Sequence, residues 1–296
     1  MRVVVLRNSF AGRGRGRAKA DRLLTALRAG GHDAVVLDVQ RADGSSVNGE
    51  LDDALRGAAA LIIAGGDGTL HHSAPAAMHA GVPVYHFPLG TENLFARQFR
   101  MTTVPGGVLG ALDRREPVTI DTATCGDRVF LLMCSVGFDS CIVERVAAAR
   151  RGGVSRLDYV AHSIAEIVRP RFVPLTIHAD GREIVRHAPG IALVANSSQY
   201  AARLDPARDA SMRDGLLDLV FIPVASRLEL ARQLVRVAWG RHLHDARVAR
   251  IRCREATIAA ASAVPYQLDG EHAGTLHADA PLRIRIAPAT LRVLAE

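Results

Sequence analysis

Short apolar segments that run into glycine-bearing turns, and then into helical patterns, make up the first part of this chain. Residues 2–6 form one such segment, followed by the glycine-rich stretch 8–16 and by apolar residues at helical spacing up to Gly30. The same order recurs, with strands predicted at 34–39, 59–64 and 82–88 and helices at 51–56 and 70–80. Strands alternating with helices at this spacing predict a doubly wound parallel sheet that binds ligands at the carboxyl ends of its strands.

The pattern changes after about residue 118 to short segments of alternating polarity. Asp180-Gly181 is a hairpin signal between two of these segments. Strands are predicted at 118–120, 129–134, 175–177, 182–185, 191–195, 217–222, 256–260, 266–268 and 282–286, and helices at 156–168 and 227–239. We therefore expect an α/β domain at 1–120 and an antiparallel β-sandwich domain at 121–286. Residues 287–296 could return to the first domain.

Composition agrees with two domains, since 296 residues with 49% hydrophobic content exceed one typical core. No apolar run is long enough for a membrane span or a signal peptide, so we expect a cytoplasmic protein, peripheral to the membrane at most. The four cysteines form no C-x-x-C pair and are expected to be reduced and mostly buried. The net charge of +7 favours anionic partners, namely phosphates, nucleic acid or anionic lipid headgroups.

Lysine is nearly absent, and this excludes two common kinase designs. Lys19 is the only lysine of the chain, and it follows no G-x-x-x-x-G and sits on no V-A-I-K strand. P-loop enzymes and protein kinases both need such a lysine for phosphate binding. A kinase activity here would have to use another design.

The strongest motif is the turn Gly65-Gly66-Asp67-Gly68-Thr69, which lies between a predicted buried strand and a predicted helix. Glycines let a backbone approach a polyphosphate, and the helix start offers free N–H donors. An acid in the middle of such a turn repels an anion unless it binds Mg²⁺ or handles a proton, so Asp67 suggests catalysis. The alternative is a tight turn in which Asp67 caps the helix.

A second turn, Gly90-Thr91, opens the next predicted helix at the same edge of the sheet. Two such turns on neighbouring strands could enclose one nucleotide. By itself, Gly90-Thr91 is equally consistent with an ordinary turn.

These residues together resemble the diacylglycerol kinase catalytic domain shared by diacylglycerol, sphingosine and bacterial lipid kinases, with NAD kinases as more distant relatives. The resemblance covers almost the whole chain. It rests on Asn8 to Gly12, Gly65 to Thr69, Gly90-Thr91-x-Asn93, Ser135 to Asp139, Asn196 with Tyr200, Asp214 to Asp218 and Leu268 to Glu271.

The resemblance implies an ATP site, a catalytic group and two roles for Mg²⁺. The residues implied for ATP are Asn8, Gly12, Gly65, Gly66, Asp67, Gly68, Thr69, Leu70, His71, His72, Gly90, Thr91 and Asn93. Glu271 matches the acceptor of the substrate hydroxyl proton, while Asp67 and Asp269 would hold Mg²⁺-ATP or orient the nucleophile. A structural Mg²⁺ is implied at Ser211, Asp214 and Leu216, with Ser211 and Leu216 contributing carbonyl oxygens.

Taken without the family, Asp269-Gly270-Glu271 is best interpreted as a hairpin turn with an exposed glutamate, and Asp214 as a turn aspartate. The chain also departs from the family in three places. Ser9 replaces a proline, Leu94 replaces an aspartate, and a threonine used near Gln40 by some members is missing. The Leu94 change removes one acid near the nucleotide, and an inactive member of the family is the corresponding alternative.

The expected function is transfer of the γ-phosphate of ATP to the hydroxyl of a diacylglycerol-like or sphingoid lipid alcohol. ATP and Mg²⁺ are expected between the two domains. NAD kinase is the enzymatic alternative, although the N-E motif typical of NAD kinases is missing, and a non-catalytic nucleotide- or lipid-binding regulator is the alternative from another class. Nucleic acid is not expected as a partner, and a homodimer is left open.

The predicted helix 227–239 is basic and amphipathic, with Leu228, Ala231, Leu234, Val235 and Ala238 on one face. Packing of this face against the core is the favoured interpretation. Transient contact with the inner surface of the membrane is the alternative. The paired histidines His71-His72 and His242-x-His244 lack H-E-x-x-H spacing or cysteine partners, so no zinc site is predicted.

Overall fold

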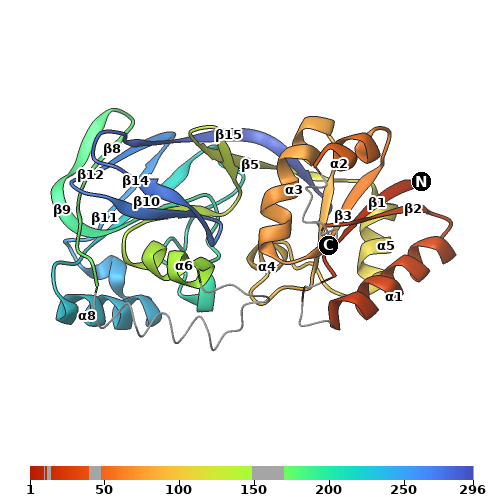
Figure 1. Ribbon diagram of the computed structural model, residues 1–296, viewed down its shortest axis with the longest axis horizontal. Coiled ribbons are helices and arrows are strands. Elements are labelled where there is room, and N and C mark those ends of the chain that lie inside the picture. Colours follow the sequence, from red (N-terminus) through yellow and green to blue (C-terminus); the bar gives the residue numbers. More distant parts are fainter. Residues whose placement is uncertain (10, 12–14, 40–47, 149–169, 296) are drawn as a thin grey trace. The chain divides into compact units, whose positions relative to one another are not determined.

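The computed structural model describes residues 1–9, 11, 15–39, 48–148 and 170–295 (Figure 1). Two compact units make up this part of the chain. Unit 1 comprises Met1–Ile120 with Ala289–Glu296, and unit 2 comprises Asp121–Pro288. Each unit is described by itself below.

Unit 1 is built on a parallel sheet. Its strand order is β15-β4-β3-β1-β2, with β1 at Arg2–Arg7, β2 at Asp33–Asp38, β3 at Ala60–Gly65 and β4 at Val84–Pro88. The end of β15 (Leu282–Val293) joins this sheet, because Val293 pairs in parallel with Val84. The carboxyl ends of β3 and β4 therefore lie side by side.

Helices cover both faces of this sheet. The helix α1 (Arg15–Ala29) packs with α5 (Pro105–Arg114), and α2 (Asn48–Leu55) packs with α3 (Asp67–Ala80), each pair on its own face (Figure 1). A short helix, α4 (Leu94–Gln98), follows β4. Every residue of β3 is buried, as expected for a central strand covered on both faces. The predicted doubly wound parallel sheet is confirmed.

Unit 2 is an antiparallel β-sandwich whose two sheets share one long strand, β9 (Arg182–Ala195). The first half of β9 pairs with β8 (Pro174–Ala179) in a sheet completed by β12 (Glu255–Ala260), the first part of β15, β5 (Val118–Cys125) and β6 (Arg128–Phe130). The second half pairs with β7 (Met133–Val136) and β10 (Leu217–Pro223). That sheet also holds β11 (Ala249–Cys253), β13 (Val264–Leu268) and β14 (Glu271–Leu276).

The corner at which β9 changes sheets lies at Gly190. A Cβ atom there would meet Phe221 Cζ at 2.5 Å and the carbonyl oxygen of Ile222 at 2.6 Å, so β10 approaches the backbone too closely for a side chain. The apolar core between the two sheets includes Ile177, Val194 and Ile258. Strands that bend from one sheet into the other form the corners of such sandwiches.

Several predictions about individual elements of unit 2 need correction. The predicted strands 182–185 and 191–195 are one continuous strand, β9, and the predicted strand 129–134 is divided into β6 and β7. The strands β11 and β14 and the helix α6 (Phe138–Ala148) were not predicted. Short 3₁₀ turns occur at Ala201–Arg203 and His242–His244. The predicted helix 156–168 lies outside the described residues.

The helix α8 (Arg227–Ala238) is present, but the prediction that its apolar face packs into the core is wrong. Leu228 and Val235 are 80% and 57% exposed. The buried side chains of the helix are Leu230, Gln233 and Val237, which lie on the other side. Hydrophobic spacing identified the helix but could not tell which side packs against the sandwich.

The cysteines and the helix lengths agree with the sequence analysis. Cys125, Cys134, Cys141 and Cys253 are all free and buried. None of the helices in the described part of the chain has the length and hydropathy that a bilayer span requires.

The corner of β9 gives a stability test. Substituting Gly190→Ala forces a methyl group against Phe221 and the backbone of β10, so we expect the free energy of unfolding to fall by about 1–3 kcal/mol. The control is Gly106→Ala in α5, where a Cβ meets nothing within 4 Å and a change of at most about 1 kcal/mol is expected. Urea unfolding followed by circular dichroism measures both. Equal stability of Gly190→Ala and the parent protein would contradict the close approach of β10 to the backbone of Gly190.

Candidate active site

The turn after β3 leads directly into α3. Gly66 is the N-cap residue of this helix, with φ −99° and ψ −177°, and as a glycine it has no side chain to cap the helix start. A Cβ on Gly65 would lie 2.6 Å from Thr69 Oγ1, so the first turn of the helix folds back against the strand end. The first N–H groups of α3 are therefore presented without a side-chain cap at the carboxyl edge of the sheet. Such groups favour anions.

Asn8, at the end of β1, lies against this turn. Its backbone N–H donates to the carbonyl of Ala64 at 2.9 Å, and its side-chain Nδ2 donates to Thr69 Oγ1 at 2.9 Å. Two of the predicted ATP-binding residues are thus in direct contact. Gly12, predicted to act with them, lies outside the described residues.

The second glycine turn touches the first through its backbone. A Cβ on Gly90 would lie 2.6 Å from Gly66 Cα, and a Cβ on Gly66 would lie 3.1 Å from Gly90 Cα. Asn93 closes this second turn, because its Oδ1 accepts from Gly90 N–H at 2.8 Å and its Nδ2 donates to Gly90 O at 2.9 Å. Thr91, between them, is exposed. The two motifs form one continuous polar edge of unit 1.

Asp67 connects the two turns. It is the first residue of α3, and its carboxylate accepts from the backbone N–H groups of Leu94 at 3.0 Å and Phe95 at 3.2 Å, at the start of α4. The acid therefore caps α4, the next helix, instead of α3 as the alternative interpretation supposed. A carboxylate at a helix start is stabilised by the N–H groups and by the helix dipole.

The remaining predicted ATP residues of α3 differ in exposure. Leu70 and His71 are buried and His72 is exposed, with the two imidazole rings in edge contact at 5.1 Å between centroids. The backbone N–H of Leu70 donates to Gly66 O at 3.2 Å. Leu94, where the family carries an acid, has its side chain buried at 6% exposure.

His86 on β4 is hydrogen-bonded to Gly65 at the start of this turn. No sequence motif had marked it as part of the site. It is fully buried, and its Nε2 lies 3.1 Å from the carbonyl oxygen of Gly65, so this nitrogen carries the proton and donates. Burial lowers the pKa of His86, partly opposed by the nearby charge of Asp67. A neutral imidazole therefore holds the end of β3 at neutral pH.

In unit 2, Asp269 is an anchor for the backbone. It is 6% exposed, and its carboxylate accepts from the N–H groups of Leu131 at 2.8 Å, Leu132 at 2.7 Å and Met133 at 3.0 Å. Its own N–H donates to Met133 O at 2.9 Å. These bonds fix the turn between β13 and β14 onto the segment that leads into β7.

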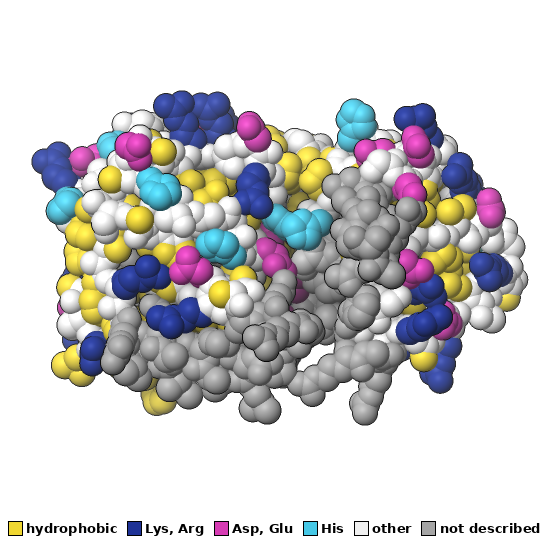
Figure 2. Space-filling model, in the orientation of Figure 1, with side chains coloured by type: hydrophobic (Ala, Val, Ile, Leu, Met, Phe, Trp, Pro, Cys, Tyr) yellow, Lys and Arg dark blue, Asp and Glu magenta, His cyan; other side chains and the backbone are white. Residues whose placement is uncertain are grey.

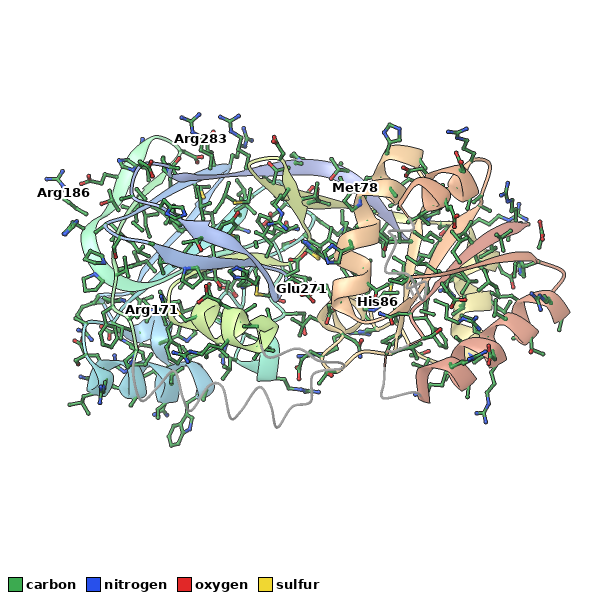
Figure 3. All side chains as sticks on the ribbon, viewed as in Figure 1. Met78, His86, Arg171, Arg186, Glu271 and Arg283 are labelled. Atoms are coloured by element: carbon green, nitrogen blue, oxygen red, sulfur yellow. The ribbon has the colours of Figure 1, made fainter. Side chains whose placement is uncertain are left out.

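Glu271 follows this turn as the first residue of β14 (Figure 3). It pairs with Leu268 across the hairpin, and Asp269 and Gly270 between them both have positive φ, at 52° and 84°. The N–H of Gly270 donates to Gln267 Oε1 at 2.6 Å. The turn that carries Glu271 is thus held on both sides by hydrogen bonds.

A buried polar chain continues from this turn. Gln267 Nε2 donates to Ser135 Oγ at 2.8 Å, and both Ser135 and Tyr200 donate to Asp139 Oδ2, Tyr200 at 2.7 Å. Burial raises the pKa of Asp139, while the hydrogen bonds from Ser135 and Tyr200 act in the opposite direction. Two further family motifs are therefore joined to the Glu271 turn within unit 2.

The aspartate of the predicted structural Mg²⁺ site is paired with an arginine of the chain itself. Asp214 Oδ2 accepts from Arg252 Nη2, and Asp214 Oδ1 accepts from Leu216 N–H at 3.1 Å. Ser211 Oγ accepts from the N–H of Arg213 at 3.3 Å. Mg²⁺ at Ser211, Asp214 and Leu216 stays a prediction, and binding through the Asp214 carboxylate would compete with its pairing to Arg252.

Neighbouring charges extend this pairing. Asp218 is 1% exposed, and Arg250 Nη2 donates to its Oδ1 at 3.3 Å while Arg250 Nη1 lies 2.7 Å from Asp209. Burial raises the pKa of Asp218, and the two arginines 250 and 252 oppose that shift. No cluster of three or more His, Cys, Asp or Glu side chains able to hold a metal occurs among the described residues.

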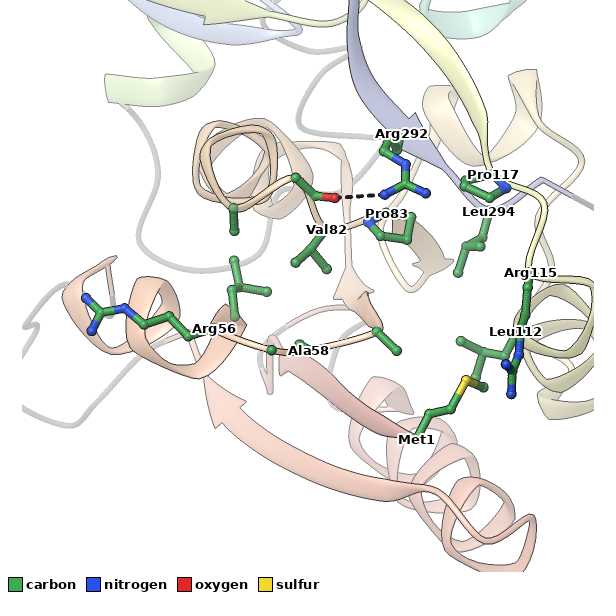
Figure 4. A pocket seen from close by; sticks show the side chains of 15 residues that line it. Met1, Arg56, Ala58, Val82, Pro83, Leu112, Arg115, Pro117, Arg292 and Leu294 are labelled. Atoms are coloured by element: carbon green, nitrogen blue, oxygen red, sulfur yellow. Dashed lines mark hydrogen bonds between the residues drawn. The ribbon is translucent and has the colours of Figure 1, made fainter.

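A separate pocket of about 560 Å³ lies at the opposite edge of the sheet in unit 1 (Figure 4). Met1, Ala59 and Pro83, which directly precede β1, β3 and β4, line it, so it opens at the amino ends of the strands. Arg292 Nη1 crosses its rim and donates to Gly81 O at 3.1 Å. The pocket contains none of the predicted ATP-binding residues.

Comparison with known proteins assigns both units to one family. The diacylglycerol kinase catalytic domain matches residues 2–125, and the YegS C-terminal NAD kinase beta sandwich-like domain matches residues 133–295. The chain belongs to the family of diacylglycerol kinases and YegS-like lipid kinases. A catalytic domain of this family implies the use of ATP.

Individual relatives agree with this assignment. The chain is 27% identical to the diacylglycerol kinase of Mycobacterium tuberculosis over 99% of its length and 94% of that protein. It is 31% identical to the "Probable lipid kinase YegS-like" of Pseudomonas fluorescens, over 79% of this chain and 76% of the relative. A crystal structure of a diacylglycerol kinase from Bacillus anthracis str. Sterne matches with a TM-score of 0.72 at 14% identity. It covers 100% of this chain and 97% of that one, a likeness that shows the fold alone.

The anchoring role of Asp269 can be separated from chemistry by measuring stability. An amide at this position retains one acceptor oxygen, so Asp269→Asn leaves at least one backbone N–H in a buried site without its charged partner. We expect the free energy of unfolding to fall by about 2 kcal/mol. The control Asp279→Asn, at an exposed turn, should change it by less than about 0.5 kcal/mol. Equal urea midpoints for both variants would rule out the anchoring role of Asp269.

Proposed function

We propose that this protein transfers the γ-phosphate of ATP to a hydroxyl group of a diacylglycerol-like or sphingoid lipid. Membership of a family of lipid kinases supports the reaction class, and relatives are named diacylglycerol kinase and lipid kinase. The assignment of ATP binding to residues 1–120 and of lipid binding to residues 121–286 is part of the same proposal.

The observation that carries the proposal is the backbone contact between Gly66 and Gly90. It joins two glycine turns at the carboxyl ends of adjacent parallel strands, beside a helix whose N-cap residue is a glycine. Parallel α/β sheets bind ligands at this edge, and N–H groups at helix starts bind phosphate. We therefore assign the polyphosphate of ATP to this edge.

Within the edge, Asn8, Gly65, Gly66, Gly68, Thr69, Gly90 and Asn93 are the residues that we assign to ATP, together with the neighbouring backbone of Leu70, His71, His72 and Thr91. Glycines at 66 and 90 supply close backbone approach without side chains. The hydrogen bond from Asn8 to Thr69 Oγ1 orients the threonine hydroxyl before any ligand binds. Such preorganisation reduces the cost of binding.

Asp67 is the carboxylate that we assign to the Mg²⁺ of Mg²⁺-ATP. Carboxylate oxygens are ordinary Mg²⁺ ligands, and the bonds to Leu94 and Phe95 hold this one in a fixed orientation at the edge. When bound, Mg²⁺ supplies neutralisation of phosphate charge, the main requirement of phosphoryl transfer. Leu94 stands where the family carries a further acid, so the acids of this pair of turns are Asp67 and Glu92, and Glu92 lies 3.9 Å from Arg97.

Glu271 is the group that we assign to accept the proton of the attacking hydroxyl, with Asp269 as the residue that positions it. The hydrogen bonds of Asp269 to residues 131–133 and of Gly270 to Gln267 hold the turn, so the carboxylate of Glu271 starts from a fixed backbone. A rigidly held base of this kind contributes about 10²- to 10⁴-fold to a rate. No step is assigned to Asp214, because its carboxylate is paired with Arg252.

Substitution of Glu271 tests the catalytic assignment. We expect Glu271→Gln to lower the rate of lipid phosphorylation at least about 100-fold, because the amide cannot accept the proton. ATP affinity, measured by calorimetry, should remain unchanged. The matched control is Glu183→Gln on the β8–β9 hairpin, whose carboxylate pairs with Arg186, and it should retain full activity. Full activity of Glu271→Gln would refute the role.

The acceptor is identified by incubating the protein with isotopically heavy ATP and either a cellular lipid extract or NAD, in separate samples, followed by mass spectrometry. We expect heavy phosphate on a lipid that contains an alcohol group. Labelling of NAD instead would support the NAD kinase alternative. Binding of ATP with no labelled product would support a non-catalytic regulator and overturn the proposal.

A further inference from the structure

The outer side of α8 exposes three large apolar side chains in one line. Leu228, Val235 and Trp239 are 80%, 57% and 70% exposed, and their spacing of seven and four residues places them on one side of the helix. Five large hydrophobic side chains are exposed in the described residues, and these are three of them. We call Leu228, Arg232, Val235, Trp239 and Arg241 the α8 outer face.

This exposure does not result from a poorly formed helix. Ser226 caps α8 by accepting from Glu229 N–H at 3.2 Å, and Glu229 accepts from the N–H of Ala225, the residue before the cap, at 2.9 Å. Leu230 is fully buried on the opposite side. Gln233, on that side too, donates to Asp245 at 2.9 Å. The helix is therefore firmly attached by one side and presents the other to solvent.

The charge around the outer face is positive. Arg227, Arg232 and Arg241 form no ion pair within the described part of the chain, although Arg232 lies near enough to Glu229 to help lower the pKa of that carboxyl. The guanidinium of Arg241 lies over the Trp239 ring at 5.7 Å from its centroid. The nearby acids are already paired, Glu229 with Arg247 at 2.9 Å and Asp245 with Arg236 and Arg247. Elsewhere on the face drawn in Figure 2, basic side chains lie scattered among acidic and apolar ones.

We propose that the α8 outer face docks this protein onto an anionic lipid bilayer. Trp, Leu and Val on one side of a helix, flanked by arginines, are the composition of helices that lie in the membrane interface. Tryptophan favours the depth of the headgroups, and each arginine near an anionic leaflet adds attraction. A protein partner or a second copy of the chain would not by itself require the excess of unpaired positive charge.

The inference rests on the proposed function in one respect, since a lipid kinase meets its substrate at a bilayer. It adds a surface outside the ATP-binding edge and the Glu271 turn, and binding at this surface needs neither ATP nor phosphate transfer. Membrane attachment and catalysis can therefore be measured separately.

The chain provides its own probe, because Trp239 is its only tryptophan. Tryptophan fluorescence of the full protein is measured without ATP on vesicles of phosphatidylcholine, with and without phosphatidylglycerol. We expect the emission to shift to shorter wavelength, and brominated lipid to quench it, on the vesicles that contain phosphatidylglycerol. Raised salt should weaken both effects.

Co-sedimentation of α8 variants with vesicles tests whether this face is the one that binds the membrane. Leu228→Ser with Val235→Ser should weaken co-sedimentation with the anionic vesicles about tenfold or more, and Arg232→Ala about fivefold. Val104→Ser, at another exposed valine, should leave it unchanged. All variants should retain phosphorylation of lipid presented in detergent micelles, so loss of micellar activity in the parent protein would count against the proposed function alone.

Two outcomes would overturn the inference. One is an unchanged Trp239 emission on anionic vesicles together with no co-sedimentation. The other is a concentration-dependent dimer of the parent protein that Val235→Ser dissociates, with vesicle binding unaffected by that change, which would identify the face as an interface between copies.

Discussion

The close approach of the Gly66 and Gly90 backbones is the constraint on which the candidate nucleotide edge depends. Two residues without side chains let the turns after β3 and β4 touch. The contact brings the start of α4 within hydrogen-bonding reach of Asp67, so one carboxylate ties both turns together. The fold of the two turns therefore requires these glycines even when no ligand is bound.

Carboxylates in the two units follow a common arrangement. Asp67 and Asp269 each accept from consecutive backbone N–H groups of a distant segment, which fixes a turn in place. Glu271 follows the second of these turns, at the start of a strand. Groups whose backbone is fixed beforehand need little reorganisation when charge develops in a reaction, which is the main way in which enzymes stabilise transition states.

Most of the fold and part of the candidate site could be predicted from local sequence patterns. The sequence predicted the parallel sheet and the glycine turns because strand, turn and helix are neighbours along the chain. It could not show that Asp67 caps α4 or that Asp269 binds residues 131–133, because those bonds join segments far apart in sequence. The pairing of Arg252 with Asp214 was hidden for the same reason. The predicted strands 182–185 and 191–195 left out the residues between them, where β9 continues through its corner at Gly190.

Hydrogen–deuterium exchange of the backbone, with and without a non-hydrolysable Mg²⁺-ATP analogue, tests the central claim most directly. The structure predicts slower exchange in residues 65–72 and 89–95, the two turns and the helix starts that follow them. Slower exchange confined to residues 55–59 and 80–83, which line the pocket at the amino ends of the strands, would contradict it.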